Sequence, residues 1–310
     1  MSGGVFMRGM SEKLIAGAVL VALIAAFAYF TNPTVQERRA LEQVRLKGGS
    51  ERDNRPVGEI DLVRLYPDIV LRLGPTDTKT VALTFDDGPD MQYTPQVLDV
   101  LRDKGVKATF FLIGNRVEEY PDVAKRIVQE GHLVGNHTYS HPEIMKAGGE
   151  LLKRELALTE QALAKIGATG SGLFRPPYGA ISPNLVEEAA ALGYRVAMWS
   201  VDSLDWRGLP KDMVVAKVME MMSPGAVVLQ HSSGGPGEDL SGSVQALPEI
   251  IDTLREQGYR FVRLDEMFPA VPASNPSDEP VGLKYRSMAR YSPVAASSQV
   301  FGLLRYASSV

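Results

Sequence analysis

The sequence contains no cysteine and only four histidines among its 310 residues. Without a thiol, the chain has no disulfide, no thiolate metal site and no cysteine nucleophile. This absence is compatible with an oxidising exterior. Any catalytic or metal-binding chemistry must therefore use other side chains.

An excess of positive charge is also missing. The 33 Lys and Arg residues are outnumbered by 37 Asp and Glu residues, and the isoelectric point is about 5.7. Because there is no basic patch and no interleaving of arginine with aromatic residues, we expect no nucleic-acid partner. With 45% hydrophobic and 23% charged residues, the chain is ordinary globular material for one large domain or two small ones.

Uncharged residues run from Leu14 to Phe30, after Arg8 and Lys13. A membrane-spanning helix needs about 17 to 25 apolar residues, so this run is a short membrane anchor or a secretory signal. The small residues at 26 and 28 offer a cleavage site for the second reading. A buried helix of a soluble core fits less well because the run has no polar face.

Both membrane readings predict an exported protein, which is the location we expect. One pattern favours the opposite orientation, because four basic residues follow the apolar run and only two precede it closely. Positive residues near a membrane segment tend to stay in the cytoplasm. These following residues are Arg38, Arg39, Arg45 and Lys47.

The two ends of the remaining chain are predicted to lie outside the main domain. Residues 31–78 contain a charged helix-prone piece and then scattered proline and glycine, which predicts a linker from the membrane. Residues 269–310 are rich in Pro, Ser and Ala without periodicity, which predicts a flexible tail. The domain itself is expected over residues 79–268.

Short β-branched, apolar runs recur through this domain and predict seven strands. The runs are 79–85, 106–113, 132–137, 172–175, 194–200, 225–231 and 259–264. Helical patterns lie between several of them. Thr94 and Ser182 are predicted N-caps, each followed by proline, of helices that end at Gly105 and Gly193, and Pro121 and Gly131 bound a third helix. A fourth pattern, at 243–258, has apolar residues on one side. Strands that alternate with helices predict a parallel sheet, and seven such units favour a complete or incomplete β/α barrel.

Chemically capable side chains follow five of these strands. In parallel α/β folds the active site lies at the carboxyl ends of the strands. Each residue alone has an ordinary reading as a turn, a cap or a solvated charge, but five at matching ends predict a catalytic rim. They are Asp86 and Asp87, then His137 and His141, then Arg175 and Tyr178, then Asp202, Asp205 and Trp206, and finally Leu229 and His231. The fourth histidine, His132, begins a strand and is predicted to be structural.

Two imidazoles and one carboxylate form a three-ligand site with open positions, as in catalytic zinc sites and non-haem iron(II) oxygenases. Pro142 disfavours a helix at His141, so a loop should carry the histidines. One aspartate of the pair can bind the ion while the other takes a proton from water. Asp205 and His231 fit a separate carboxylate and histidine pair that donates a proton, which the oxygenase reading does not explain.

The segments "TFDDGP", "HTYSH", "RPPY", "DSLDW" and "LQH" occur in this order. They resemble the five motifs of the NodB-homology polysaccharide deacetylases, carbohydrate esterase family 4. The resemblance covers residues 79 to 268 and implies a distorted β/α barrel. It also implies hydrolysis of the N-acetyl group of an amino sugar to a free amine and acetate.

The resemblance implies a role for each of ten residues. Asp87, His137 and His141 would bind a divalent metal, usually zinc or cobalt. Asp86 would be the general base, oriented by Arg175, and His231 the general acid, held by Asp205. The backbone near Tyr178 would stabilise the oxyanion, and Trp206 with Leu229 would enclose the acetyl methyl group. Ser232 departs from the acidic residue that many members carry there, but it is neither a ligand nor an acid.

The glycan itself is less constrained by the sequence. An exported bacterial protein has peptidoglycan as the nearest polymer, so its N-acetylglucosamine or N-acetylmuramic acid is the expected target. Chitin oligomers and acetyl-xylan stay open. The alternatives are hydrolysis of non-sugar amides on the same fold and a non-catalytic wall-binding protein. Nothing in the sequence indicates the oligomeric state.

Overall fold

The computed structural model describes residues 59–235 and 237–269. The predicted signal or anchor, most of the predicted linker and nearly all of the predicted tail lie outside these residues. Within the described ranges, no helix is both long and apolar enough to cross a bilayer.

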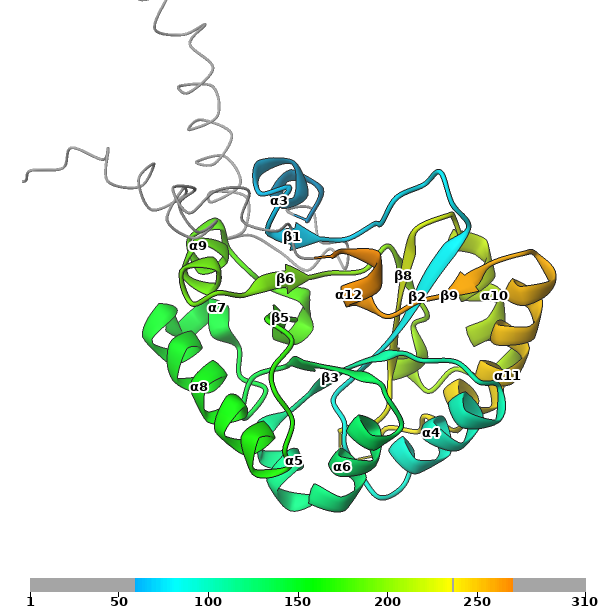
Figure 1. Cartoon of the computed structure of the whole chain (residues 1–310), viewed down its shortest axis with the longest axis horizontal. Helices are drawn as coiled ribbons and strands as arrows, with labels where there is room; N and C mark the ends of the chain where they lie inside the picture. Colours follow the sequence, from blue (N-terminus) through cyan, green and yellow to red (C-terminus); the bar gives the residue numbers. More distant parts are fainter. Residues whose placement is uncertain (1–58, 236, 270–310) are drawn as a thin grey trace, which may run out of the picture.

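The described residues form one sheet in which all paired strands are parallel (Figure 1). The sheet order is β1-β6-β5-β4-β3-β2-β8-β7, with β9 also paired to β2. The end strands β1 and β7 are not paired with each other, so the barrel is incomplete. The strands are β1 (Val70–Leu71), β2 (Thr80–Asp86), β3 (Thr109–Leu112), β4 (Leu133–Asn136), β5 (Leu173–Phe174), β6 (Arg195–Ala197), β7 (Val201–Asp202), β8 (Ala226–His231) and β9 (Arg260–Phe261).

All seven predicted strands are confirmed; β2 is as long as the apolar run that predicts it, and the other six are shorter than theirs. The parallel half-barrel agrees with the predicted distorted β/α barrel. Two strands were not predicted, β1 and β7, and each has only two residues. The predicted strands come from apolar runs of at least four residues, whereas the run at β1, residues 69–71, has three.

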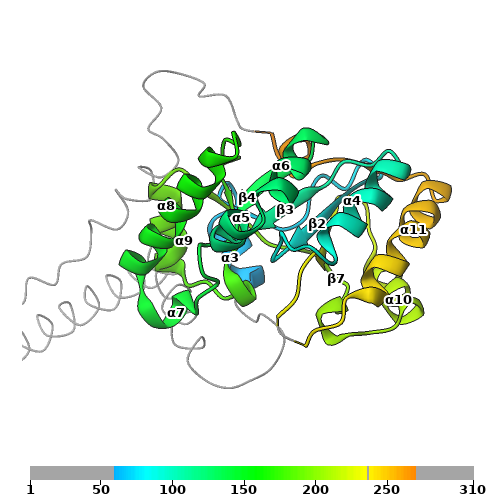
Figure 2. The ribbon, with the colours of Figure 1, turned by 90° about the horizontal axis from the view of Figure 1, so that it is seen from below.

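Helices surround the outside of the strands. Figures 1 and 2 agree that α8 and α9 lie at one side of the molecule, with α10 and α11 at the opposite side. The α-helices are α3 (Glu59–Leu65), α4 (Thr94–Asp103), α5 (Gly114–Glu119), α6 (Pro121–Gln129), α7 (Ile144–Ala147), α8 (Gly149–Lys165), α9 (Pro183–Ala191), α10 (Lys211–Met221), α11 (Ser241–Glu256) and α12 (Leu264–Met267). Two 3-10 helices are η1 (Pro177–Gly179) and η2 (Asp205–Arg207).

The predicted helices are confirmed as α4, α6, α9 and α11. Ser182 caps α9 as expected, because its hydroxyl accepts a hydrogen bond from the Leu185 amide. At α4 the predicted cap is wrong by one residue, since Tyr93 is the cap position. The carboxylate of Asp90 accepts from the Tyr93 and Thr94 amides and supplies the acceptor instead.

The start of the domain also differs from the prediction. Residues 59–71 were expected to be linker, but they form α3 and β1. Leu62, Tyr66 and Ile69 are buried in one apolar cluster with residues of α9, and Val70 pairs with Val196 of β6. This segment therefore belongs to the folded domain, because its apolar side chains complete the core beside β6.

The centre of the sheet explains how the site is held rigid. All seven residues of β2 are buried, as expected for a parallel strand covered on both faces. Gly135 of β4 leaves room for Phe111, since a Cβ at this glycine would lie 2.5 Å from the ring. The Phe111 ring in turn packs 4.2 Å from the guanidinium carbon of Arg175. The β4 backbone at Gly135 thus lies close to the Phe111 ring, and this ring helps to hold Arg175 below the rim.

Candidate active site

The carboxyl ends of the strands bring most of the predicted site residues together. Asp86 ends β2 and Asp87 follows it, and His137 follows β4. Asp86 is in direct register with His231 of β8. A candidate base and a candidate acid therefore lie on neighbouring strands, side by side at one rim.

Three side chains at this rim offer a metal site. Ligand atoms of Asp87, His137 and His141 all lie within 4.8 Å of one another. The Asp87 Oδ1 atom is 3.2 Å from Nε2 of His137 and 3.4 Å from Nε2 of His141. This oxygen is buried without a hydrogen-bond partner among the described residues. A buried carboxylate oxygen that faces two imidazole nitrogens fits a divalent cation.

The second nitrogen of His137 supports the same reading. Its Nδ1 lies 2.7 Å from the carbonyl oxygen of Arg175 and donates to it. The Nε2 lone pair is then free to bind a metal, which is the usual arrangement of a metal-binding histidine. As predicted, a loop rather than a helix separates the two histidines.

The electrostatics of these ligands also favour a cation. Burial alone would raise the pKa of Asp87, but the close approach and charge of His137, together with the charges of His231 and His141, hold this pKa well below its usual range. Burial, with the nearby charge of His137, lowers the pKa of His141 to about 4. At neutral pH, Asp87 is therefore ionised and His141 neutral, which are the forms that bind metals. For His137, burial alone would lower the pKa, but the charges of Asp86 and Asp87 raise it, so an ion would have to displace a proton there.

Asp86 forms a buried ion pair with Arg175, and its Oδ2 lies 3.8 Å from Nε2 of His137. Its Oδ1 is 2.8 Å from Nη1 of Arg175, and the Arg175 side chain has 0% exposure. The same guanidinium donates to the Thr84 hydroxyl and to two backbone carbonyls, of Ala197 and Met198. With so many contacts the arginine holds the orientation of Asp86 firmly.

His231, which is partly exposed, pairs with the buried Asp205. Nδ1 of His231 is 2.8 Å from Oδ1 of Asp205, and the His231 amide donates to Oδ2 at 2.8 Å. Burial alone would lower the pKa of His231, but the charge and hydrogen bond of Asp205 raise it to about 10. His231 therefore carries a proton at neutral pH, as a general acid requires.

The three residues predicted for substrate contact differ in their solvent exposure. The Tyr178 ring is 67% exposed and lies edge-on to His141 with centroids 4.6 Å apart. Trp206 follows Asp205 in η2 and is 38% exposed. Leu229 lies two residues before His231 on β8 and is buried, with 4% exposure. Tyr178 and Trp206 thus offer surface to a ligand, whereas Leu229 offers only a small area.

Some residues that contact the site were not predicted. Arg116 of α5 donates to the carbonyl of Asp87 and to that of Gly234, so it connects the loops after β2 and β8. Ser243 of α11 donates to Oδ2 of Asp205 at 2.7 Å. Single polar residues on helices carry no sequence signal that separates them from surface residues.

His132 lies away from the rim, as predicted. It directly precedes β4, and its Nδ1 accepts a hydrogen bond from the Ala108 amide. Burial, with the charges of Lys107, Arg126 and Arg263, lowers its pKa to about 4. This neutral, buried histidine has a structural place in the fold.

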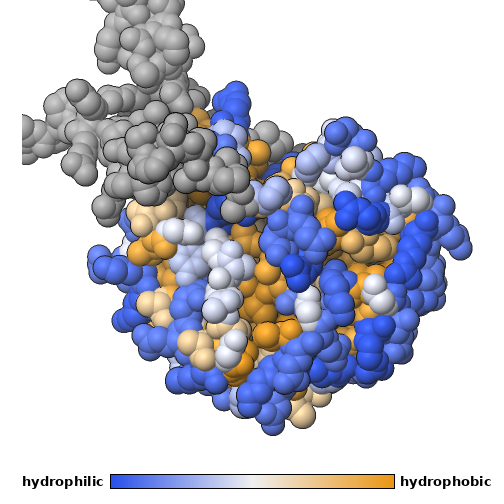
Figure 3. Space-filling view, in the orientation of Figure 1, coloured by the Kyte–Doolittle hydropathy of each residue, from blue (hydrophilic) through white to orange (hydrophobic). Residues whose placement is uncertain are grey.

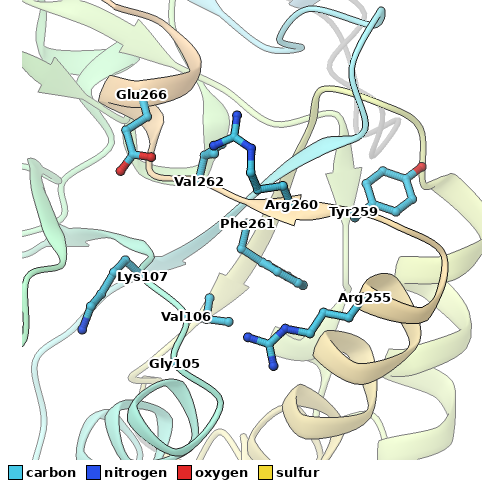
Figure 4. A pocket seen from close by; sticks show the side chains of 9 residues that line it. All are labelled: Gly105, Val106, Lys107, Arg255, Tyr259, Arg260, Phe261, Val262 and Glu266. Carbon is cyan, nitrogen blue, oxygen red and sulfur yellow. The ribbon is translucent and has the colours of Figure 1, made fainter.

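A pocket of about 400 Å³ lies at the opposite, amino-terminal ends of the strands (Figure 4). It contains none of the predicted site residues. Its lining residues are Gly105, Val106, Lys107, Arg255, Tyr259, Arg260, Phe261, Val262 and Glu266. The candidate active site is therefore at the rim and not in this pocket.

Figure 3, in the orientation of Figure 1, shows a mixed surface in which polar residues cover the outer helices and apolar residues gather toward the middle.

The family model described as polysaccharide deacetylase matches residues 73–197. A peptidoglycan-N-acetylglucosamine deacetylase of Bacillus cereus is 45% identical over 195 residues, which cover 63% of this chain and 70% of the relative. The chain belongs to the polysaccharide deacetylase family. Its members hydrolyse N-acetyl amide bonds of sugars, so the predicted family and enzyme class are confirmed.

Solved structures of the family agree with the fold. The Bc1960 peptidoglycan N-acetylglucosamine deacetylase, in complex with an N-hydroxybenzamide, has a TM-score of 0.66 and 41% identity and covers 69% of this chain and 98% of that chain. BA3943 of Bacillus anthracis, described as a family 4 pseudoenzyme, has a TM-score of 0.59 and 32% identity and covers 64% of this chain and 68% of that chain. The same fold therefore occurs in a named deacetylase and in a pseudoenzyme.

Proposed function

We propose that this polysaccharide deacetylase removes the acetyl group from N-acetylglucosamine residues of peptidoglycan, outside the cytoplasm and with zinc as its metal. The observation that carries the proposal is the joint placement of three elements at one rim. These are the Asp87, His137 and His141 ligand set, the Asp86 and Arg175 pair, and the His231 and Asp205 pair. A pseudoenzyme would not need all three of these residue sets.

A divalent ion held by Asp87, His137 and His141 would polarise the acetyl carbonyl and make a water molecule more acidic. Asp86 takes the proton from the attacking water, and Arg175 holds the orientation of its carboxylate. The amide of Tyr178 donates to the oxygen that gains negative charge. Its left-handed backbone, with φ of 60°, turns this segment at the rim.

His231 acts on the other side of the bond that breaks. It donates its proton to the sugar nitrogen as the carbon–nitrogen bond opens, so the amine leaves in neutral form. Asp205 keeps the ring protonated and oriented until then. Trp206 and Leu229 contact the acetyl methyl group and exclude larger acyl groups.

The choice of sugar rests on the relatives. The Bacillus cereus relative and the Bc1960 enzyme are both described as peptidoglycan N-acetylglucosamine deacetylases. Their action on the cell wall supports an extracytoplasmic place for this chain, which the apolar residues 14–30 would provide as an anchor or a signal. The tail over 269–310 is then a segment outside the catalytic domain.

Acetate release and mass spectrometry on peptidoglycan fragments and chitin oligomers test the proposal. We expect a mass loss of one acetyl group on N-acetylglucosamine of the wall fragments, at least about tenfold faster than on N-acetylmuramic acid or chitin oligomers, a difference of about 1.4 kcal/mol in transition-state binding. Deacetylation only of small non-sugar amides would overturn it, and so would no acetate release from any glycan with zinc or cobalt present.

A further inference from the structure

The loop between the two histidine ligands has a backbone that its own residues do not favour. Thr138 has a φ of 67° and His141 a φ of 56°, both in the left-handed region. Each such non-glycine residue costs about 1 kcal/mol or more. The loop therefore needs outside contacts to keep both imidazoles directed at Asp87.

Side-chain oxygens accept a hydrogen bond from every backbone amide of the loop between Thr138 and His141. Asn136 Oδ1 accepts from Thr138 at 3.0 Å, and Thr138 Oγ1 accepts from His141 at 3.1 Å. The two middle amides, of Tyr139 and Ser140, both donate to Oε2 of Glu155, at 3.0 and 2.8 Å. The Ser140 hydroxyl also bonds the Glu155 carboxylate.

Glu155 differs from the other two acceptors because its side chain is a carboxylate. It lies on α8 with 4% exposure, and none of the lysines, arginines and histidines that the structure describes forms an ion pair with it. A buried carboxylate without a cation is costly unless several donors satisfy it. Here the donors come from the ligand loop itself.

We propose that Glu155 is a positioning residue for the metal site. Its carboxylate fixes the 138–141 loop in the conformation that presents His137 and His141, so the ligands are arranged before the ion binds. Partners of this kind behind the ligands typically change metal affinity 10- to 100-fold when they are removed. The inference relies on the metal site of the proposed function, but not on the identity of the glycan.

The test measures zinc affinity by competition with a chelating dye, with thermal unfolding recorded for each metal-free protein. Glu155→Ala should raise the zinc Kd about 10- to 100-fold, because two backbone amides of the ligand loop lose their acceptor. Glu155→Gln should raise it less than about tenfold, since a glutamine oxygen in the place of Oε2 accepts from the same two amides. With zinc at saturation, kcat of Glu155→Gln should stay within about threefold of the unmodified enzyme.

Glu118→Gln is the matched control. Glu118 also contacts the loop, but through the hydroxyl of Tyr139 at the surface rather than through the backbone. This variant should keep the zinc Kd within about twofold, because a surface hydrogen bond contributes little. If Glu155→Ala does not fold, Glu155→Asp replaces it, since its shorter side chain cannot reach both amides and should raise the zinc Kd.

A folded Glu155→Ala or Glu155→Asp protein with unchanged zinc Kd would overturn the inference. An equal loss of affinity in Glu118→Gln would do the same, because the effect would then be general electrostatics. The zinc measurement contains no substrate. A failure to deacetylate peptidoglycan would therefore refute the proposed function and leave the result on Glu155 intact.

Discussion

Replacing Asp86 with asparagine removes the negative charge beside a guanidinium with no solvent access. Removing one partner of a buried ion pair typically costs 3 to 5 kcal/mol. Arg175 keeps its hydrogen bonds to Thr84, Ala197 and Met198, and the asparagine oxygen can still accept from Nη1. Only the charge is uncompensated, so we expect the lower end, about 3 kcal/mol.

For a domain of this size, 1 kcal/mol changes the melting temperature by about 2 to 4 °C. The metal-free Asp86→Asn protein should therefore melt about 6 to 12 °C below the unmodified enzyme. Calorimetry measures this difference. Loss of the general base should also lower kcat about 10²- to 10⁴-fold, measured by acetate release. Zinc affinity should change less than about tenfold, because Asp86 is not among the grouped ligands.

Asp87→Asn is the control, one residue away. Asn tolerates the left-handed backbone that Asp87 has, with φ of 69°, and Asp87 forms no ion pair with Arg175. This variant should raise the zinc Kd by more than about 100-fold, which distinguishes it from Asp86→Asn. Identical melting temperatures for Asp86→Asn and the unmodified enzyme would refute the argument that the buried pair is held by charge.

Three further predictions test the acid, the metal and the domain boundary. Asp205→Asn removes the main cause of the raised pKa of His231. His231 must be protonated to act as the general acid. The high-pH limb of the kcat/KM profile should move to lower pH by about one unit or more, and an unmoved limb would exclude His231 as the acid. A chelator should abolish acetate release and added zinc or cobalt should restore it, whereas full activity in the chelator would contradict a metal mechanism. Ile69→Ala should lower the free energy of unfolding in urea by about 2 to 5 kcal/mol, because this side chain of the α3–β1 segment is fully buried. A decrease under about 0.5 kcal/mol would show that the segment is a linker and not part of the folded domain.

The strand ends could be predicted because their signals are local. An apolar run followed by Asp86 and Asp87, or by His137, identifies both a strand and the residue at its end. The order of strands then places these residues on one rim without any knowledge of side-chain packing. The resemblance to a known family added the roles, which the spacing alone left open between the two aspartates.

The supporting residues could not be predicted for the opposite reason. Glu155 and Arg116 lie on helices among other charged residues, where a charge normally marks the solvent face. Only the packing of α8 against the ligand loop shows that Glu155 is buried. The α3–β1 segment was missed because proline and glycine around it are typical of a linker, while its partner β6 is more than a hundred residues away in the sequence.

Backbone strain in the described residues is concentrated at the rim. Elsewhere, as at the ends of α4, α6 and α9, glycine takes the left-handed conformation. Five non-glycine residues take it, namely Asp87, Thr138, His141, Tyr178 and Leu204, and all five lie in four of the motifs that identify the family. Glycine would relieve the strain at Asp87 and His141, but it has no side chain to bind a metal. The site needs both the tight turn and the functional side chain, so the fold retains the strained backbone at these residues. Contacts such as Arg116 to the Asp87 carbonyl and Glu155 to the histidine loop then hold the strained backbone in place. This is why residues outside the motifs should affect metal affinity as well as stability.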